Sequence, residues 1–427
     1  DLDRINAFLN RFLSHERKLR WMRLDNAAKI YPAAKRRKWN NFFRLSATLC
    51  DEVDKTVLRN AMDVTMRRFP SIAVRLCRGA FWYYLEELSS APEITDEKSW
   101  PLAHTPFESI NECALRVIVY KNRIAVEFYH ALTDGTGGMV FLKSLLAEYI
   151  EQKYGVEIPN ECGVLDRLTQ PQEEELEDSF SKNAGSVSVS RNASTAFKIH
   201  YTPERDDFRH LTTFILDSNA ALAAAKSCGV SLTVYLTSAM LLALQRIQDE
   251  QTPDKRRQKP IRVVVPVNLR RLFPSRTLRN FVHVIMPEID PRMGDYEFSE
   301  ILTSVKHQLG LLVTKKNLCA MFTPNVNAER SPLLRVMPLF LKNIAMKLVY
   351  DTVGERTNCL NLSNLGDIKV PDAMRRYVTR FDFILGVQAT KPNNCGVLSY
   401  NGKLYMNFIR NTVEPCLLYT SPSPRDA

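Results

Sequence analysis

The apolar positions in the first half of the chain predict strands that alternate with helices. Segment 42–50 alternates enough to be a strand, and the strands 114–120 and 123–129 meet at a short hairpin turn. Apolar residues between 140 and 149 recur with helical period, which predicts a helix from about 138 to 154. Further strands are expected at 72–76 and 80–85, and helices at 4–19 and 51–68.

The second half shows the same alternation of strands and helices. Its run at 261–267 is continuously apolar, as expected for a central strand buried on both faces, and Asn401-Gly402 predicts a type I′ hairpin. The two halves therefore predict an α/β fold of two related subdomains with a cleft between them. The remaining elements are expected as strands at 211–216, 281–286, 359–364, 381–387, 396–400 and 403–408 and as helices at 219–228, 232–247, 296–316 and 333–350.

The character of the sequence changes between the halves and again at its end. Residues from about 169 to 195 are first acidic and then rich in Ser, Asn and Gly, which is typical of a solvated linker. The predicted division is a first subdomain at 1–168, a linker at 169–197 and a second subdomain at 198–415. Segment 416–427 resembles a translated sequencing adapter and is expected to be non-native. Because the chain begins at Asp1 without Met, its N-terminus is expected to be incomplete.

Composition and charge leave several kinds of ligand open. The 427 residues carry a formal net charge of +11, and 45% of them are hydrophobic, which is enough for two cores. The basic excess fits an anionic ligand such as a nucleotide-bearing thioester, a nucleic acid, a membrane surface, or simply a solvated basic surface. The sequence has no zinc-finger spacing and no basic run with interleaved aromatic residues, so no motif supports nucleic-acid binding.

The cysteines give no sign of a disulfide framework or a metal site. All nine are scattered, without a CxxC pair or a Cys/His cluster, which favours a reducing compartment. The sequence shows no N-terminal signal and no apolar run of about 18 residues. We therefore expect a cytoplasmic protein with no bound metal and no stable membrane insertion.

One segment has the residue types that acid–base chemistry needs. The strand at 123–129 leads directly into His130, and a Gly-rich turn beginning at Asp134-Gly135 then opens a helix. Glycines there permit a tight backbone turn, and a helix N-terminus offers free N–H groups. A histidine with a pKa near neutrality is the usual general base for a hydroxyl or an amine. From the spacing alone, a purely structural role for His130 and for Asp134 stays open.

Three motifs resemble those of the chloramphenicol acetyltransferase-like superfamily. The segment 130–138, HALTDGTGG, resembles its HxxxDG motif, and 265–270, VPVNLR, is similar to its PVNxR strand. The segment 361–366, NLSNLG, resembles the SNLG segment of its free-standing alcohol acetyltransferase branch, as do the stretches 24–32, 68–70 and 273–280. The motifs occur in the expected order, and the resemblance covers about residues 20–410. It implies two subdomains, each a mixed, largely antiparallel sheet flanked by helices, with a tunnel between them.

The resemblance also implies a role for each motif residue. His130 would be the general base, acting without an acyl-enzyme, and Asp134 would form a structural salt bridge with Arg270. Acyl-CoA, with acetyl-CoA as the expected form, would be a co-substrate rather than a permanently bound cofactor, and a small alcohol or amine would be the acceptor. We expect a monomer. The candidate oxyanion or substrate contacts are the Gly135 N–H, Ser363, Asn364 and Asn268. Arg271, Arg276 and Arg279 are candidate contacts for the CoA phosphates, and solvated surface positions are the alternative for them.

Departures from the family patterns narrow the expected activity. Condensation domains usually have HHxxxDG, whereas Tyr129 precedes His130, and the DFGWG motif of plant acyltransferases is absent. The favoured activity is therefore acetyl transfer from CoA to an alcohol hydroxyl. The alternatives are a condensation-type enzyme that forms an amide or ester from a carrier-protein-bound donor, and a non-catalytic binding scaffold with the same fold.

Overall fold

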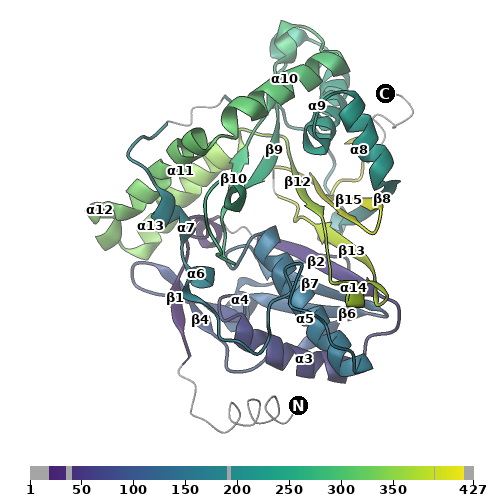
Figure 1. Cartoon of the computed structure of the whole chain (residues 1–427). Helices are drawn as coiled ribbons and strands as arrows, with labels where there is room; N and C mark the ends of the chain where they lie inside the picture. The colour runs from purple at the N-terminus through teal and green to yellow at the C-terminus, as the bar shows by residue number, and fades with distance from the viewer. Residues whose placement is uncertain (1–18, 35–40, 190–193, 389, 418–427) are drawn as a thin grey trace.

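Two large sheets form the centre of the molecule, one above the other in Figure 1. The structure is a computed structural model, and it describes residues 19–34, 41–189, 194–388 and 390–417. The helix expected at 4–19 and the segment 418–427 lie outside the described residues, apart from Leu19.

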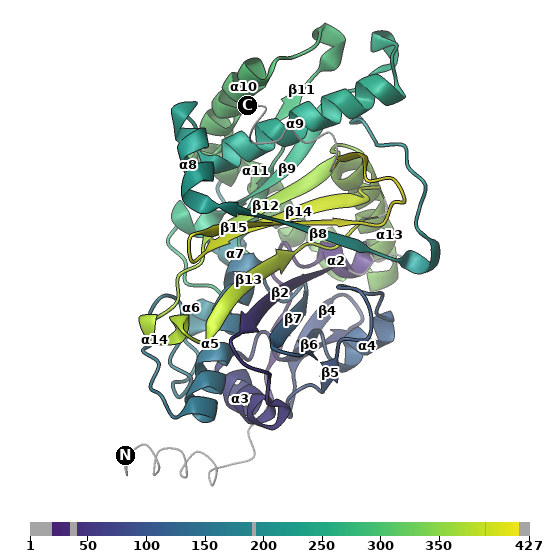
Figure 2. The ribbon, with the colours of Figure 1, turned by 90° about the vertical axis from the view of Figure 1, so that its right-hand side faces the viewer.

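The first subdomain is built on a five-stranded sheet with the order β13-β2-β7-β6-β5. All its pairs are antiparallel except β5 with β6, and helices α3 and α5 pack against each other below it (Figure 2). A small sheet, β1-β4-β3, completes this half. The elements are β1 Trp21–Arg23, β2 Phe42–Leu49, α3 Lys55–Arg68, β3 Val74–Arg78, β4 Tyr83–Glu87, β5 Ile94–Asp96, α4 Phe107–Glu112, β6 Leu115–Tyr120, β7 Arg123–Tyr129, α5 Gly135–Tyr154 and β13 Val378–Ile384.

The second subdomain is built on a seven-stranded sheet with the order β10-β9-β12-β14-β15-β8 and β11 beside β9. Strand β12 runs parallel to both of its neighbours and the other pairs are antiparallel, so the sheet is mixed. Its apolar face packs against α9, which in turn contacts α8 and α10. The elements are β8 His210–Asp217, α8 Ser218–Ser227, α9 Leu232–Gln251, β9 Ile261–Asn268, β10 Val282–Ile285, β11 Glu288–Ile289, α10 Phe298–Leu312, β12 Leu360–Asp367, β14 Asn393–Tyr400 and β15 Lys403–Arg410.

Strand β13 joins the two sheets. It comes from the segment assigned to the second subdomain, but it pairs with β2 of the first sheet and also packs against β14. A Cβ atom on Gly396 of β14 would lie 2.2 Å from the carbonyl oxygen of Phe383, so only glycine allows this close approach. The second subdomain is therefore not continuous within 198–415.

The expectation of a solvated linker is wrong for its first part. Two short helices, α6 Glu173–Leu176 and α7 Ser179–Asn183, pack against the body of the protein. Glu175 is buried and accepts two hydrogen bonds of 2.6 Å from the Arg68 guanidinium. Phe180 is buried in a third apolar cluster with Phe281 and Phe322. The acidic composition of this segment reflects a buried ion pair as well as solvated glutamates.

The helical region between β11 and β12 differs from the expectation in two ways. The single helix expected at 333–350 is divided into α12 Pro332–Val336 and α13 Leu339–Val349, because Pro338 lacks an N–H and disfavours helical backbone at Met337. Helix α11 Lys315–Arg330 was not predicted, and Pro324 lies inside it. The other short helices are α2 Ile30–Ala33 and α14 Asp372–Arg375, with single 3₁₀ turns at Arg205–Asp207, Lys255–Arg257, Leu269–Arg271 and Pro291–Met293 and a π-helical turn at Tyr350–Glu355.

None of the described helices is by itself long and apolar enough to cross a membrane. Helices α8 and α9 reach that length and apolarity only together, and they meet at an angle of 81°.

Candidate active site

His130 follows the last residue of β7, in the middle of the first sheet. Its backbone N–H donates to the carbonyl of Asn41 at 2.8 Å, which fixes the chain as it leaves the strand. The imidazole stacks on Tyr31 at 4.8 Å and meets the edge of Phe43 at 5.0 Å. Burial among these rings lowers the pKa of His130 below its ordinary value, although the residue keeps some accessible surface. The imidazole is therefore neutral at pH 7, as a general base must be.

Asn280 determines which imidazole nitrogen carries the proton. Its Oδ1 lies 3.2 Å from His130 Nδ1, while its Nδ2 donates to the carbonyl of His130 at 3.0 Å and to Asp25 Oδ2 at 3.2 Å. Because the amide nitrogen faces two acceptors, the amide oxygen must face the imidazole, and an oxygen can only accept. Nδ1 is then protonated, and Nε2 has its lone pair free.

Asp25 stands behind Asn280 and is fully buried. Its Oδ1 accepts from the N–H of Ala28 at 2.7 Å, and its nearest cation, the Arg279 Nε, is 3.7 Å from Oδ2. Burial raises the pKa of Asp25 to about 6, and Arg279 opposes this shift only in part. His130, Asn280 and Asp25 thus form a line of polar groups leading from the candidate base into the protein.

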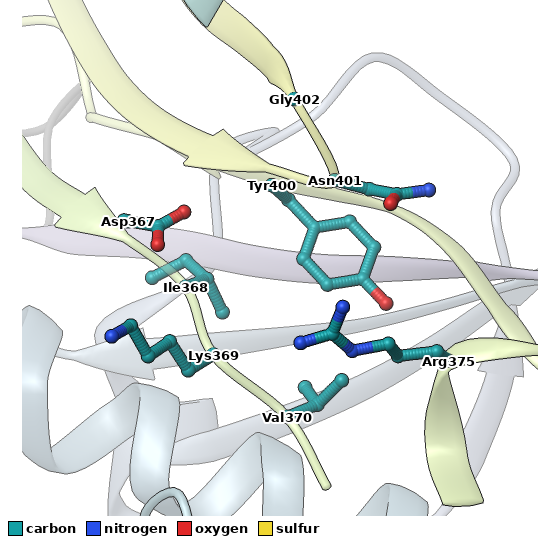
Figure 3. Close-up of a pocket in the computed structure, with 8 residues that line it drawn as sticks. All are labelled: Asp367, Ile368, Lys369, Val370, Arg375, Tyr400, Asn401 and Gly402. Carbon is teal, nitrogen blue, oxygen red and sulfur yellow. The ribbon is translucent and has the colours of Figure 1, made fainter. Parts of the chain in front are cut away.

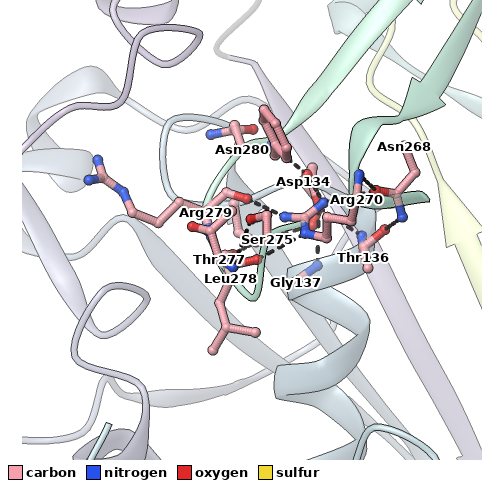
Figure 4. Close-up of polar contacts among 12 residues, drawn as sticks. Asp134, Thr136, Gly137, Asn268, Arg270, Ser275, Thr277, Leu278, Arg279 and Asn280 are labelled. Carbon is pink, nitrogen blue, oxygen red and sulfur yellow. Dashed lines mark hydrogen bonds and ion pairs between the residues drawn. The ribbon is translucent and has the colours of Figure 1, made fainter. Parts of the chain in front are cut away.

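Asp134 locks the loop that follows His130 (Figure 4). Its Oδ1 caps α5 by accepting from the N–H groups of Thr136 and Gly137 at 3.0 and 3.1 Å. Its Oδ2 accepts at 2.8 Å from both Arg270 Nη1 and the N–H of Phe281. The ion pair expected between Asp134 and Arg270 is therefore present. All four donors are backbone N–H groups or the Arg270 guanidinium, so the carboxylate stabilises the loop and does not hydrogen-bond to the imidazole.

Arg270 ties the second subdomain to this loop. Besides Asp134, its guanidinium donates to the carbonyls of Thr277 at 2.9 Å and Arg279 at 2.5 Å, so it closes the segment 270–279 into a ring (Figure 4). A Cβ atom on Gly137 would lie 2.1 Å from the carbonyl oxygen of Leu278, so glycine is required where α5 meets this segment. The two halves of the molecule are thus joined at the candidate base.

Gly135 and Ser363 are placed as a pair of candidate oxyanion donors. The Gly135 N–H is the first of α5, and no described residue accepts from it. A Cβ atom on Gly135 would lie 2.7 Å from Leu365 Cδ2, so the start of α5 touches β12. In β12 the Leu362 side chain enters the core of the second subdomain, so the next residue, the buried Ser363, faces the opposite way. Ser363 therefore lies on the same face of β12 as Leu365, which contacts the start of α5.

Two of the predicted substrate contacts, Asn364 and Asn268, form hydrogen bonds within the protein. The Asn364 side chain donates to Thr233 at the start of α9 at 3.3 Å and accepts from the N–H of Gly366 at 2.8 Å. It lies on the face of β12 away from Ser363, because successive strand residues alternate. The Asn268 amide donates to Thr136 at 3.1 Å and accepts from the N–H of Arg270 at 3.1 Å. Both amides hydrogen-bond within the framework of the site, and their contact with the oxyanion or the substrate stays a prediction.

The three candidate phosphate-binding arginines are in different environments. Arg279 is buried and donates to the carbonyls of Leu176 at 3.3 Å and Arg23 at 2.6 Å, so its proposed contact with CoA phosphates is wrong. Arg276 is exposed, donates to the Gln172 side chain at 3.4 Å and lies 3.9 Å from Glu174, and Arg271 is exposed as well. These two side chains have the freedom that contact with an incoming phosphate requires.

A hollow of about 300 Å³ lies at the far end of β12 (Figure 3). It carries charges of both signs and neither a histidine nor a nucleophile, so it is separate from the candidate active site. It is lined by Asp367, Ile368, Lys369, Val370, Arg375, Tyr400, Asn401 and Gly402. Among the described residues, no group of three or more His, Cys, Asp or Glu side chains is arranged to hold a metal ion.

Sequence reasoning did not assign a role to Asp25, Tyr31 or Asn280. All three lie in stretches that had been noticed only for their resemblance, 24–32 and 273–280. Their contribution depends on side chains that are far apart in the sequence, such as His130 and Asn280, which are 150 positions apart. Hydrophobic periodicity carries no information about such a meeting.

Several solved structures are similar to this chain in overall fold. No protein-family model and no curated protein sequence matches the chain. Polyketide synthase associated protein 5 from Mycobacterium tuberculosis superposes with a TM-score of 0.55 at 14% identity, over 93% of this chain and 96% of that one. Trichothecene 15-O-acetyltransferase from Fusarium sporotrichioides gives 0.54 at 13% identity, over 94% of each chain. The starter condensation domain of rhizomide synthetase, in complex with C8-CoA and Leu-SNAC, gives 0.56 at 11% identity, over 95% of this chain and 90% of that one.

The chain has the fold that these three proteins share. It is the α/β fold of two mixed-sheet subdomains that the motifs predicted, and the similarity extends over nearly the whole chain. Identities of 11–14% establish the fold alone, so the chemistry must be inferred from the residues described above.

Proposed function

We propose that this protein is an acyl-CoA-dependent acyltransferase that moves an acetyl or other short acyl group to an alcohol hydroxyl. The observation that carries the proposal is the state of His130. Its Nδ1 faces an acceptor, Asn280 Oδ1, at 3.2 Å, and no described residue lies within hydrogen-bond distance of Nε2. A neutral imidazole with a free Nε2, where two subdomains meet, is suited to take a proton from an acceptor hydroxyl.

The reaction needs no covalent enzyme intermediate. The acceptor hydroxyl gives its proton to His130 Nε2 while its oxygen attacks the thioester carbonyl. The tetrahedral intermediate then collapses and the carbon–sulfur bond breaks. The CoA sulfur, as the leaving group, receives the proton from the imidazolium. Asn280 Oδ1 accepts from Nδ1–H throughout and stabilises the imidazolium, as a charge-assisted hydrogen bond does. The products are an ester and free CoA.

The negative charge of the intermediate requires donors on the thioester side. We assign this role to the Gly135 N–H and the Ser363 hydroxyl, which belong to the two elements, α5 and β12, that meet at Gly135 and Leu365. Preorganised donors of this kind contribute roughly 100- to 1,000-fold each in rate. The exposed Arg271 and Arg276 are the proposed contacts for CoA phosphates. The tunnel expected for the pantetheine arm is part of the same proposal.

The test is a thiol-release assay. The protein is incubated with acetyl-CoA or octanoyl-CoA and a panel of primary and secondary alcohols, and free CoA is followed with a thiol reagent. We expect His130→Ala to lower the rate roughly 100- to 10,000-fold. His104→Ala, at an exposed histidine outside the site, is the matched control and should be unaffected. Equal rates in wild type and His130→Ala would exclude His130 as the base.

The same assay distinguishes the alternative donor. A condensation-type enzyme would be inactive with acyl-CoA and active with an acyl group on a carrier protein, and its activity would still require His130. Solved condensation domains share the fold, so the carrier-protein arm belongs in the first experiment.

A further inference from the structure

Helices α12 and α13 expose an apolar surface of unusual size. We call it the α12–α13 face, and its members are 43–70% exposed. Soluble monomers rarely leave so many large apolar side chains together in water. Both views place α13 at the edge of the molecule (Figures 1 and 2). The face consists of Leu333, Val336, Phe340, Leu341, Ile344, Leu348 and Val349.

The orientation of α13 is the reverse of that of an ordinary surface helix. Phe340, Ile344 and Leu348 succeed one another at intervals of four, point outward and are 57%, 65% and 65% exposed. Lys342, in contrast, is buried, donates to the carbonyl of Phe81 at 2.9 Å and lies 3.7 Å from the centre of the Trp82 ring. These contacts hold α13 with Lys342 facing inward and Phe340, Ile344 and Leu348 facing outward, so defined side-chain contacts set the orientation of the exposed face.

The charge of this segment indicates what the face contacts. From Arg330 to Tyr350 the sequence has four basic residues and no Asp or Glu. Arg335 and Lys347 are exposed beside the apolar residues. Apolar side chains that enter the headgroup region, flanked by Arg and Lys, are the pattern of helices that lie on anionic membranes. A water-soluble partner could cover the same apolar surface, but it would not require basic residues without acidic ones in this segment.

We propose that the α12–α13 face docks the protein on the surface of an anionic phospholipid membrane. The position of the face gives the docking a use. Helix α13 packs against α2, and Tyr31 of α2 stacks on His130 at 4.8 Å. If the proposed acyltransferase function holds, a lipophilic acceptor alcohol dissolved in the membrane would reach the base beside the docked surface. The docking itself does not depend on that function.

Vesicle flotation tests the proposal on the whole chain without acyl-CoA. The protein is mixed with vesicles of phosphatidylcholine alone, or with about 30% phosphatidylserine, and floated in a density gradient. We expect wild type to float with the anionic vesicles. The variant Phe340→Ser/Ile344→Gln/Leu348→Gln should bind the anionic vesicles with an affinity at least about tenfold lower, because three apolar side chains that would enter the membrane are lost. Arg335→Gln/Lys347→Gln should lose the preference for anionic lipid.

The matched control places three glutamines at exposed apolar positions elsewhere. Ile215→Gln/Leu222→Gln/Leu311→Gln changes residues that are 49%, 39% and 70% exposed on β8, α8 and α10, and it should float like wild type. Circular dichroism and thermal melting show that every variant is folded. Wild type that stays at the bottom of the gradient, or a triple α13 variant that floats equally well, would overturn the proposal. So would a wild-type dimer in sedimentation equilibrium that the α13 variant dissociates, because the face would then join two copies.

Discussion

Two buried aspartates flank the His130 loop, and they are paired very differently. Asp134 accepts four hydrogen bonds of 2.8–3.1 Å, one of them from Arg270. Asp25 accepts from Ala28 and Asn280, and its nearest cation is 3.7 Å away. Its pKa rises to about 6 because burial outweighs these partners. A fully paired carboxylate fixes a loop, whereas a poorly paired one makes its surroundings sensitive to protons.

Breaking the ion pair between Asp134 and Arg270 should have the largest effect on stability. Arg270→Met leaves Asp134 buried without its cation and frees the carbonyls of Thr277 and Arg279. We expect a loss of about 3–5 kcal/mol in the free energy of unfolding, measured by urea denaturation. Arg276→Met removes an exposed arginine of the same segment and should cost less than about 1 kcal/mol. Equal losses in the two variants would show that the Asp134 pair does not hold the loop.

Removing Asn280, which links Asp25 to the candidate base, should mainly affect the rate. Asn280→Ala takes away the acceptor of Nδ1–H, worth about 1.5–3 kcal/mol when the imidazole is charged, so kcat should fall roughly 10- to 100-fold with KM little changed. In wild type the acid limb of kcat/KM should lie below pH 6.5, since burial lowers the pKa of His130. Activity is lost as pH falls through that pKa, because the protonated base cannot accept.

The pH profile separates a positioning role from a structural one. Asn280→Ala should move the acid limb, because Asn280 favours the charged imidazole. Asn364→Ala, which removes the contact between β12 and α9, should lower stability by about 1 kcal/mol and leave the limb in place. If the acid limb of kcat/KM lies at the same pH in Asn280→Ala and in wild type, Asn280 only packs against His130.

Neutralising Asp25 should change how the stability of the protein depends on pH. Its folded-state pKa of about 6 lies above the ordinary 3.8, so the unfolded state ionises first as pH rises. Protonated Asp25 therefore makes its whole contribution to the free energy of unfolding below about pH 4, and this contribution is lost as the pH rises through 6. Asp25→Asn should remove this loss, on the order of 2 kcal/mol between pH 4.5 and 7 in urea titrations. Parallel pH dependence in the variant and wild type would place the titration elsewhere.

The sequence predicted the fold well because the fold depends on local periodicity and turn residues. Strand β7, the Gly-opened helix α5 and the Asn401-Gly402 hairpin lie where apolar spacing and glycine require them. The Asp134–Arg270 pair came from motif resemblance and is present at 2.8 Å. The catalytic roles of His130, Gly135 and Ser363 stay predictions until the assay is done.

What the sequence missed depends on contacts between distant segments. Asn364 stands next to Ser363 in the SNLG segment, and only the strand alternation of the folded β12 shows that it faces α9. Arg279 looked like its neighbours Arg271 and Arg276, but it is buried against Asp25 and the carbonyl of Arg23. The polar segment at 173–183 looked solvated, because neither its pairing with Arg68 nor the burial of Phe180 is encoded locally.

The crossing of β13 into the first sheet has a consequence for synthesis on the ribosome. Strand β2 is paired with β7 on one edge, and its other edge stays unpaired until β13 is synthesised. Thr379 of β13 hydrogen-bonds to Thr48 of β2 across 331 positions of sequence. At ordinary translation rates, that wait lasts roughly 15 to 70 s. During this time the nascent first subdomain carries an open strand edge of the kind that chaperones protect from aggregation. The first sheet is therefore completed only after β13 has been synthesised.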